Sequence, residues 1–168
     1  DCRHDYRNAR GEPDRCRWQA VCLGLICLLL GLLPAAADTL RIATYNAGME
    51  AAGPGLALQS LQRGDNLAQL AAVQVVVALK ADVLLLTGID YDLQGLTLTA
   101  FADRLRAAGL DYPYLLPLRP NTGVATGVDM DGNGRLGEPR DAQGFGLFAG
   151  QAGMAILSRL PIETTGIR

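Results

Sequence analysis

Three short runs of apolar residues along the chain have the composition of β-strands. They cover residues 40–46, 82–86 and 152–158, and the first of them ends at the polar Asn46. The second run is apolar at four consecutive positions, which is typical of a strand that is covered on both faces. The pattern therefore predicts three strands, one of them central in a sheet.

Two segments between these runs have a helical pattern. Residues 66–80 follow Asp65, a suitable N-cap, and residues 98–108 carry an apolar stripe that follows Thr97. We therefore expect two helices, which alternate with the strands. This order indicates an α/β fold.

The rest of the chain shows no periodic pattern. Residues 48–60 are rich in glycine and alanine and are interpreted as a loop, and Pro113, Pro117 and Pro120 break the chain after the second helix. Residues 121–150 are rich in glycine and aspartate and contain no clear element. A loop of that length inside a domain is often functional.

The first 37 residues have a different composition. An arginine-rich stretch precedes the apolar run AVCLGLICLLLGLL and the small residues PAAAD, which is the order of a secretory signal peptide. The run is shorter than the roughly 20 apolar residues of a transmembrane helix. We expect residues 1–37 to be removed and residues 38–168 to be secreted or periplasmic, with no membrane span. An uncleaved N-terminal anchor is the alternative.

Removal of this segment changes the available chemistry. All four cysteines and the single histidine, His4, lie in it. Residues 38–168 contain no cysteine or histidine. This excludes catalysis by a serine–histidine or cysteine–histidine pair in that segment, and it excludes zinc sites built on cysteine or histidine. The remaining carboxylates, amides and hydroxyls suit hard cations such as Mg²⁺ or Ca²⁺. The formal net charge of −2 and the lack of a Lys/Arg cluster give no sign of a nucleic-acid surface.

Three motifs occur in a defined order: LRIATYNAG, ADVLLLTGIDYD and QAGMAILSRLPI. Together they resemble the endonuclease/exonuclease/phosphatase family, whose fold is the deoxyribonuclease-I-like four-layer α/β sandwich. The segment before the third motif is also similar to a secreted bacterial branch of that family. The resemblance implies an α/β fold class, with residues 38–168 forming the first half of a partial four-layer sandwich.

The resemblance also implies an activity, the metal-dependent hydrolysis of a phosphate ester or of a phosphodiester such as nucleic acid. It makes Asn46 a metal-site residue, for Mg²⁺ or another divalent cation. The family has a metal-binding glutamate at the end of its second strand, and Gly88 stands at that position here. Asp90, two residues later, is the alternative ligand.

The family's other catalytic groups, an Asp-Asn pair and an Asp-His pair, belong to the second half of its fold. The three motifs cover only the first half of that fold, and the 168 residues end before the positions of either pair, so we expect the chain to lack its C-terminal half and to be inactive as it stands.

A second candidate metal site lies in the segment DMDGNG. Asp129, Asp131 and Asn133 occupy alternate positions, as at the start of an oxygen-lined Ca²⁺ loop. The position that would close such a loop holds Arg140, and two nearby acids, Glu138 and Asp141, are possible substitutes. A solvated turn that binds nothing is the alternative.

Two rival interpretations of the whole chain remain open. The first is a non-catalytic exported module, derived from the same fold, that binds Ca²⁺ or a partner. The second is a truncated product that does not fold stably.

Overall fold

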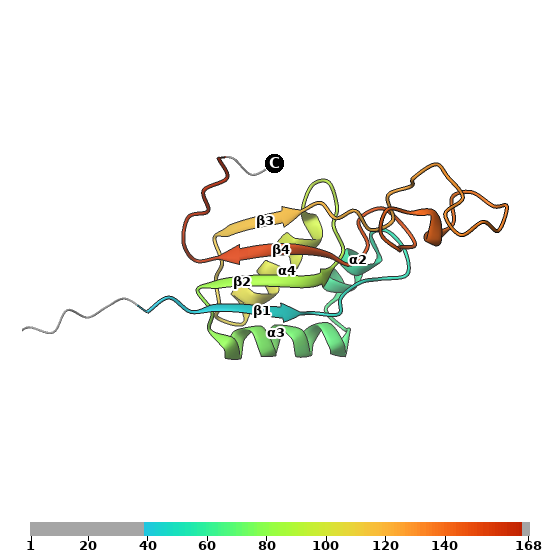
Figure 1. The fold of residues 1–168 in the computed structure, drawn as a ribbon. Helices are drawn as coiled ribbons and strands as arrows, with labels where there is room; N and C mark the ends of the chain where they lie inside the picture. The colour runs from blue at the N-terminus through green and yellow to red at the C-terminus, as the bar shows by residue number, and fades with distance from the viewer. Residues whose placement is uncertain (1–38, 166–168) are drawn as a thin grey trace, which may run out of the picture. The chain divides into compact units, whose positions relative to one another are not determined.

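A computed structural model describes residues 39–165, which form a four-stranded sheet with helices packed on one face (Figure 1). The expected signal peptide, residues 1–37, lies outside this range. Among residues 39–165, no helix is long and apolar enough to cross a membrane. The elements, in chain order, are β1 (Ile42–Asn46), α2 (Leu56–Arg63), α3 (Leu67–Leu79), β2 (Val83–Ile89), α4 (Leu96–Ala107), β3 (Tyr114–Leu118), the 3-10 helix η1 (Pro139–Asp141) and β4 (Gly153–Ser158).

The sheet has the strand order β1-β2-β4-β3. β1 and β2 are parallel, whereas β4 is antiparallel to both β2 and β3. The three predicted strands and the two predicted helices are therefore confirmed, with ends shifted by a few residues. The mixed α/β architecture is consistent with the partial deoxyribonuclease-I-like fold that the resemblance implies.

The core lies between the sheet and the helices. Leu84 and Leu86 of β2 are fully buried, as are Phe101 and Leu105 of α4 and Val76 of α3. Burial of a side chain of this size contributes about 1.5–3 kcal/mol, so these contacts hold the helices on the sheet.

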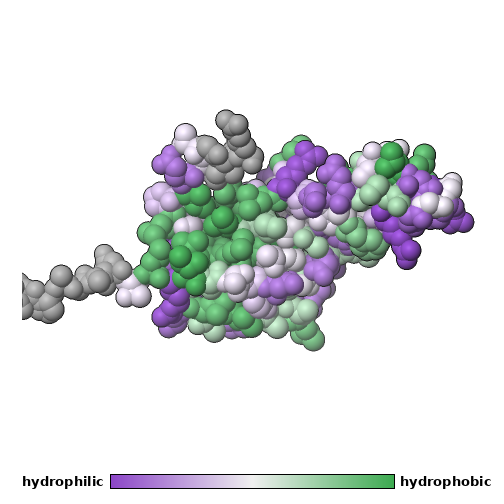
Figure 2. All heavy atoms as spheres, in the orientation of Figure 1, coloured by the Kyte–Doolittle hydropathy of each residue, from purple (hydrophilic) through white to green (hydrophobic). Residues whose placement is uncertain are grey.

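The opposite face of the sheet is open in the described part of the chain. Ile42, Met154 and Tyr114 expose 69%, 44% and 39% of their surface. Figure 2 shows hydrophobic residues gathered over the strands on this side. A contiguous apolar surface of this kind favours association.

The helix α2 was missed by the sequence analysis, which interpreted residues 48–60 as a loop. Glycine and alanine dominate this segment, yet Ala57 and Leu61 are buried on one side of the helix. The guanidinium group of Arg104 in α4 donates hydrogen bonds to the carbonyl of Leu61, at 2.7 and 3.0 Å. The helix is thus fixed by packing and by this long-range cap, neither of which is visible in local sequence.

The strand β3 was also missed, because Pro113 and Pro117 suggested a broken chain. Pro117 lies inside β3, opposite Ala155 of β4. Proline lacks a backbone N–H donor and is found in sheets mainly on edge strands. β3 is such an edge, with β4 as its only neighbour in the sheet of the described residues.

Both predicted helix caps were wrong. The N-cap of α3 is Asn66 rather than Asp65, and its side-chain oxygen accepts two backbone N–H groups of the first turn. At α4 the cap is supplied by Asp92, whose carboxylate accepts from the N–H groups of Leu96 and Thr97, both at 2.8 Å. Thr97 is therefore a capped residue and not the cap.

Candidate active site

The parallel strands β1 and β2 end at the same edge of the sheet. Asn46, the last residue of β1, pairs with Thr87 of β2. Its side-chain oxygen accepts a 3.1 Å hydrogen bond from the N–H of Gly48. Asn46 is exposed, so its amide remains accessible at this edge.

Gly88 lies beside Asn46 and interrupts β2. The pairing of β2 with β4 shifts between Thr87 and Ile89, and Gly88 has a φ of +68° at this irregularity. A Cβ atom at Gly88 would overlap the side-chain oxygen of Asn46 and lie 3.0 Å from the N–H nitrogen of Gly48. The backbone conformation at this position therefore favours glycine, and glycine offers no side chain to bind a metal.

Glu50 is the acid that the structure brings to this position and that the sequence analysis missed. Its Oε2 atom lies 3.3 Å from the point where a Cβ of Gly88 would be. The only available signal was its place four residues after Asn46, as the first acid that follows the strand. No periodic pattern identifies a residue in such a loop.

The segment that carries Glu50 is held on both sides. The N–H of Met49 donates to the carbonyl of Gly88 at 2.7 Å, and the side chain of Met49 is buried. The N–H of Ala51 donates to Asp90, and the carbonyl of Ala51 accepts from the side chain of Gln151 at 2.8 Å. The backbone around Glu50 is thus fixed by its two neighbours.

Asp90 lies next to this segment and is almost fully buried, with 6% of its surface exposed. One oxygen accepts from the N–H of Ala51 at 2.9 Å and the other from the N–H of Ala152 at 3.0 Å. Burial raises the pKa of Asp90 above its usual value, although these two N–H groups act to lower it; the charge of Glu50 adds to the rise. Asp90 therefore has a structural role, which limits its freedom to bind a metal.

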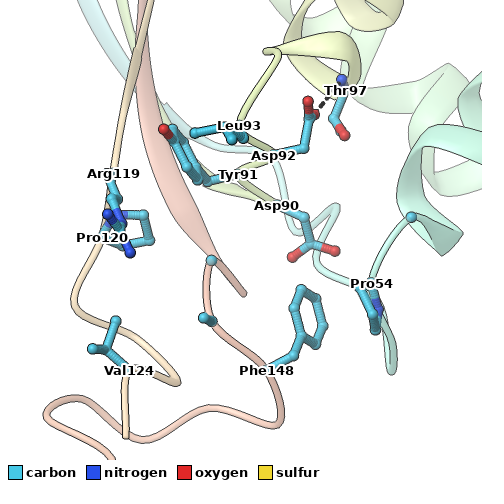
Figure 3. A pocket seen from close by; sticks show the side chains of 13 residues that line it. Pro54, Asp90, Tyr91, Asp92, Leu93, Thr97, Arg119, Pro120, Val124 and Phe148 are labelled. Atoms are coloured by element: carbon cyan, nitrogen blue, oxygen red, sulfur yellow. Dashed lines mark hydrogen bonds between the residues drawn. The ribbon is translucent and has the colours of Figure 1, made fainter.

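A pocket of about 460 Å³ opens beyond Asp90. Figure 3 shows Asp90, Arg119 and Phe148 around this hollow, with Tyr91 near Arg119. The wall combines apolar side chains with two acids, Asp90 and Asp92, and one basic residue, Arg119, which is exposed. Pockets with apolar walls and a few polar groups are typical of ligand sites.

The donor atoms at this edge fit a hard divalent cation. The amide oxygen of Asn46 and the carboxylate of Glu50 are oxygen donors, which Mg²⁺ prefers, whereas both oxygens of Asp90 are already bonded to backbone N–H groups. No nitrogen or sulfur ligand lies among them. Asn46 lies against Gly88 and Asp90 follows Gly88 by two residues, so both predicted residues lie in this part of the fold.

The second predicted site lies in the long segment between β3 and β4, which extends beyond the sheet in Figure 1. Asp129, Asp131 and Asp141 each offer an oxygen, and these oxygens lie within 4.8 Å of one another. Asp141 is buried, and of the two acids considered as substitutes for a closing carboxylate it is the one that belongs to this group. The side chain of Asn133 instead donates to Asp131 and Glu138.

The acids of this loop are already hydrogen-bonded to the backbone. Asp129 accepts from the N–H groups of Gly132 and Gly134, both at 2.7 Å. The N–H of Gly134 is the main reason that the pKa of Asp129 is lowered. Asp141 accepts from the N–H groups of Met130 and Glu138 at 2.9 and 3.1 Å. These hydrogen bonds hold the carboxylates of Asp129 and Asp141 in place before any cation binds.

Comparison with known proteins gives one clear match. Residues 43–168 match the model of the Endonuclease/Exonuclease/phosphatase family, and this range contains both candidate sites. No curated protein and no solved structure matches the chain significantly.

Proposed function

The chain belongs to the endonuclease/exonuclease/phosphatase family, and from this premise we propose that it is an exported, divalent-cation-dependent hydrolase of phosphate esters or phosphodiesters. The family acts on phosphate-ester or nucleic-acid substrates and typically uses divalent cations. The observation that carries the proposal is the group of oxygen donors at the sheet edge where β1 and β2 end. This group includes the side-chain oxygen of Asn46. Export is proposed from the signal-peptide pattern of residues 1–37.

Each part of the site would have its own task. A bound cation would polarise the phosphoryl group and stabilise negative charge. The side-chain oxygen of Asn46 would hold it, with Asp90 as the alternative ligand. Arg119 would attract the phosphate to the pocket, because a guanidinium matches phosphate oxygens in charge and shape. Phe148 would cover an apolar part of the substrate.

We propose that these 168 residues are inactive by themselves. Residues 38–168 contain no histidine, and Asp90 has both oxygens engaged by backbone N–H groups. A general base typically contributes roughly 10²–10⁴-fold to a rate. Binding should therefore be retained where turnover is absent.

Calorimetry with inorganic phosphate tests this proposal. We expect phosphate to bind in the presence of Mn²⁺, to bind much more weakly in EDTA, and to lose affinity in Arg119→Ala. Turnover of bis(4-nitrophenyl) phosphate should stay at background. Phosphate affinity that is unchanged by EDTA and by Arg119→Ala would contradict the proposed site. Clear turnover of the diester that is lost in Asn46→Ala would contradict the proposed inactivity.

A second candidate function is that of a non-catalytic Ca²⁺-binding or interaction module. The observation that favours it is the convergence of Asp129, Asp131 and Asp141. Three carboxylates with a glycine at the turn can begin a Ca²⁺ shell. The two functions differ in which residues a cation needs, and the loop variants described in the Discussion separate them.

A further inference from the structure

We infer that Glu50 supplies the acidic metal ligand that Gly88 cannot provide. The inference rests on the proposed cation-dependent function and adds a residue to its site. It starts from the position of the Glu50 carboxylate, one oxygen of which is among the three atoms nearest to the place where a Cβ atom of residue 88 would lie.

The geometry places two oxygens from different residues around one point. From the Cβ position at Gly88, Oε2 of Glu50 lies 3.3 Å away and the amide oxygen of Asn46 lies closer still. Both groups reach the edge from the β1 side, so Glu50 approaches the site from the segment after β1 and not from β2. An amide and a carboxylate together give a neutral donor and a charged donor, and Mg²⁺ sites often rest on one or two carboxylates.

The state of the carboxylate supports this role. Asp90 has both oxygens bonded to N–H groups. In contrast, no hydrogen bond or ion pair engages the side chain of Glu50 within residues 39–165, and the residue is exposed. Its oxygens are available to a ligand, whereas those of Asp90 already hold the backbone.

The fixed backbone makes the placement specific. Met49 is anchored in the core and by its bond to the carbonyl of Gly88, and Ala51 is tied to both Asp90 and Gln151. A free side chain on a fixed backbone loses only its own rotamer freedom when it binds a metal. A side chain at Gly88 would displace Asn46, so the absence of a side chain there preserves the position of the Asn46 amide.

Mn²⁺ binding by the full chain tests the inference directly. The parent carries Asp129→Asn and Asp131→Asn, so that the loop acids do not contribute. Free Mn²⁺ is measured by electron paramagnetic resonance and bound Mn²⁺ by calorimetry, for the parent and for Glu50→Gln. Asp65→Asn is the matched control, since Asp65 is an exposed acid whose partner Arg63 is more than half exposed.

We expect Glu50→Gln to weaken Mn²⁺ binding by at least about tenfold, on the scale of lost metal-site groups, and Asp65→Asn to leave it unchanged. Thermal melts in EDTA should be alike for all three proteins, because Glu50 makes no contact that holds the fold. Parent-like Mn²⁺ affinity in Glu50→Gln would overturn the inference and leave the proposed function standing. A parent that binds no Mn²⁺ at millimolar concentration would overturn the cation-dependent function and the inference together.

Discussion

The carboxylate of Asp90, just after β2, accepts a 3.0 Å hydrogen bond from the backbone N–H of Ala152, just before β4. Ala152 has a φ of +50°, a left-handed conformation that costs a residue with a Cβ about 1–2 kcal/mol. The second oxygen of Asp90 binds the N–H of Ala51, after β1. One buried acid therefore ties together three segments around the candidate site.

Replacing Asp90 should destabilise the protein. Asp90→Ala leaves two backbone N–H groups without their partner, and each such loss costs about 1–3 kcal/mol. Asp90→Asn keeps one acceptor oxygen and should lose less. Urea unfolding in EDTA measures the difference without any metal. If Asp90→Ala unfolds at the parent's urea midpoint, the structural role of Asp90 is wrong.

Gly88 should tolerate no side chain. Gly88→Ala and Gly88→Glu both place a Cβ against Asn46 at a positive φ. We therefore expect the free energy of unfolding to fall by about 1–3 kcal/mol, with no gain in Mn²⁺ affinity. Gly53→Ala is the control, because a Cβ there has its nearest contact at 3.4 Å, from a leucine side chain, and its φ is not positive. Thermal melts of the three variants check this, and a Gly88→Glu protein as stable as the parent would refute it.

The cap of α4 should make stability depend on pH. Burial tends to raise the pKa of Asp92, but hydrogen bonds, those from the N–H groups of Thr97 and Leu96 above all, outweigh it, and the pKa is lowered. The unfolded value is near 3.8, so this contribution is present above pH 4 and is lost as the pH falls through the lower folded pKa.

Asp92→Ala should therefore cost about 1–2 kcal/mol at pH 7, and the difference from the parent should shrink at pH 3 and below. Asp103→Ala is the control, as an exposed acid on α4 itself. Denaturant unfolding at several pH values gives the measurement. An effect of Asp92→Ala that persists unchanged at the lowest pH would show that the charge is not responsible.

The acidic loop, which carries Asp129, Asp131 and Asp141, should bind Ca²⁺ weakly. Extracellular Ca²⁺ modules have dissociation constants of about 10⁻⁴–10⁻³ M, and Arg140 lies 3.9 Å from Asp131, where it competes with a cation. We expect a Ca²⁺ heat in calorimetry that disappears in Asp129→Ala/Asp131→Ala and persists in Asn46→Ala. The same heat in all three proteins would place Ca²⁺ elsewhere.

Export should remove the N-terminal segment. The small residues that end at Ala37 predict a mature protein that begins at Asp38. N-terminal sequencing of protein recovered outside the cytoplasm measures the site. A product that still carries Trp18 would favour the N-terminal anchor instead.

Sequence alone could predict the three strands that form short apolar runs. It could also predict the two helices between them, one of which has apolar side chains that repeat along one face. It could not predict β3, since Pro117 is acceptable only because that strand lies at an edge, and edge position is a property of the whole sheet. Asn46 was identified because it stands in LRIATYNAG, the first of the three motifs that carry the family resemblance. Glu50 was not, because its position depends on hydrogen bonds of Met49 and Ala51 to residues far along the chain.

The strand order has a consequence for how the chain folds during synthesis. β2 and β4 are neighbours at the centre of the sheet, although α4, β3 and the acidic loop separate them in sequence. β3 has no partner in this sheet until β4 has been made, while β1 and β2 can pair much earlier. Long-range pairing of this kind slows folding, because the entropy of closing the intervening chain is lost before the contacts form. A nascent chain would thus hold its first two strands and their helices well before the sheet is complete.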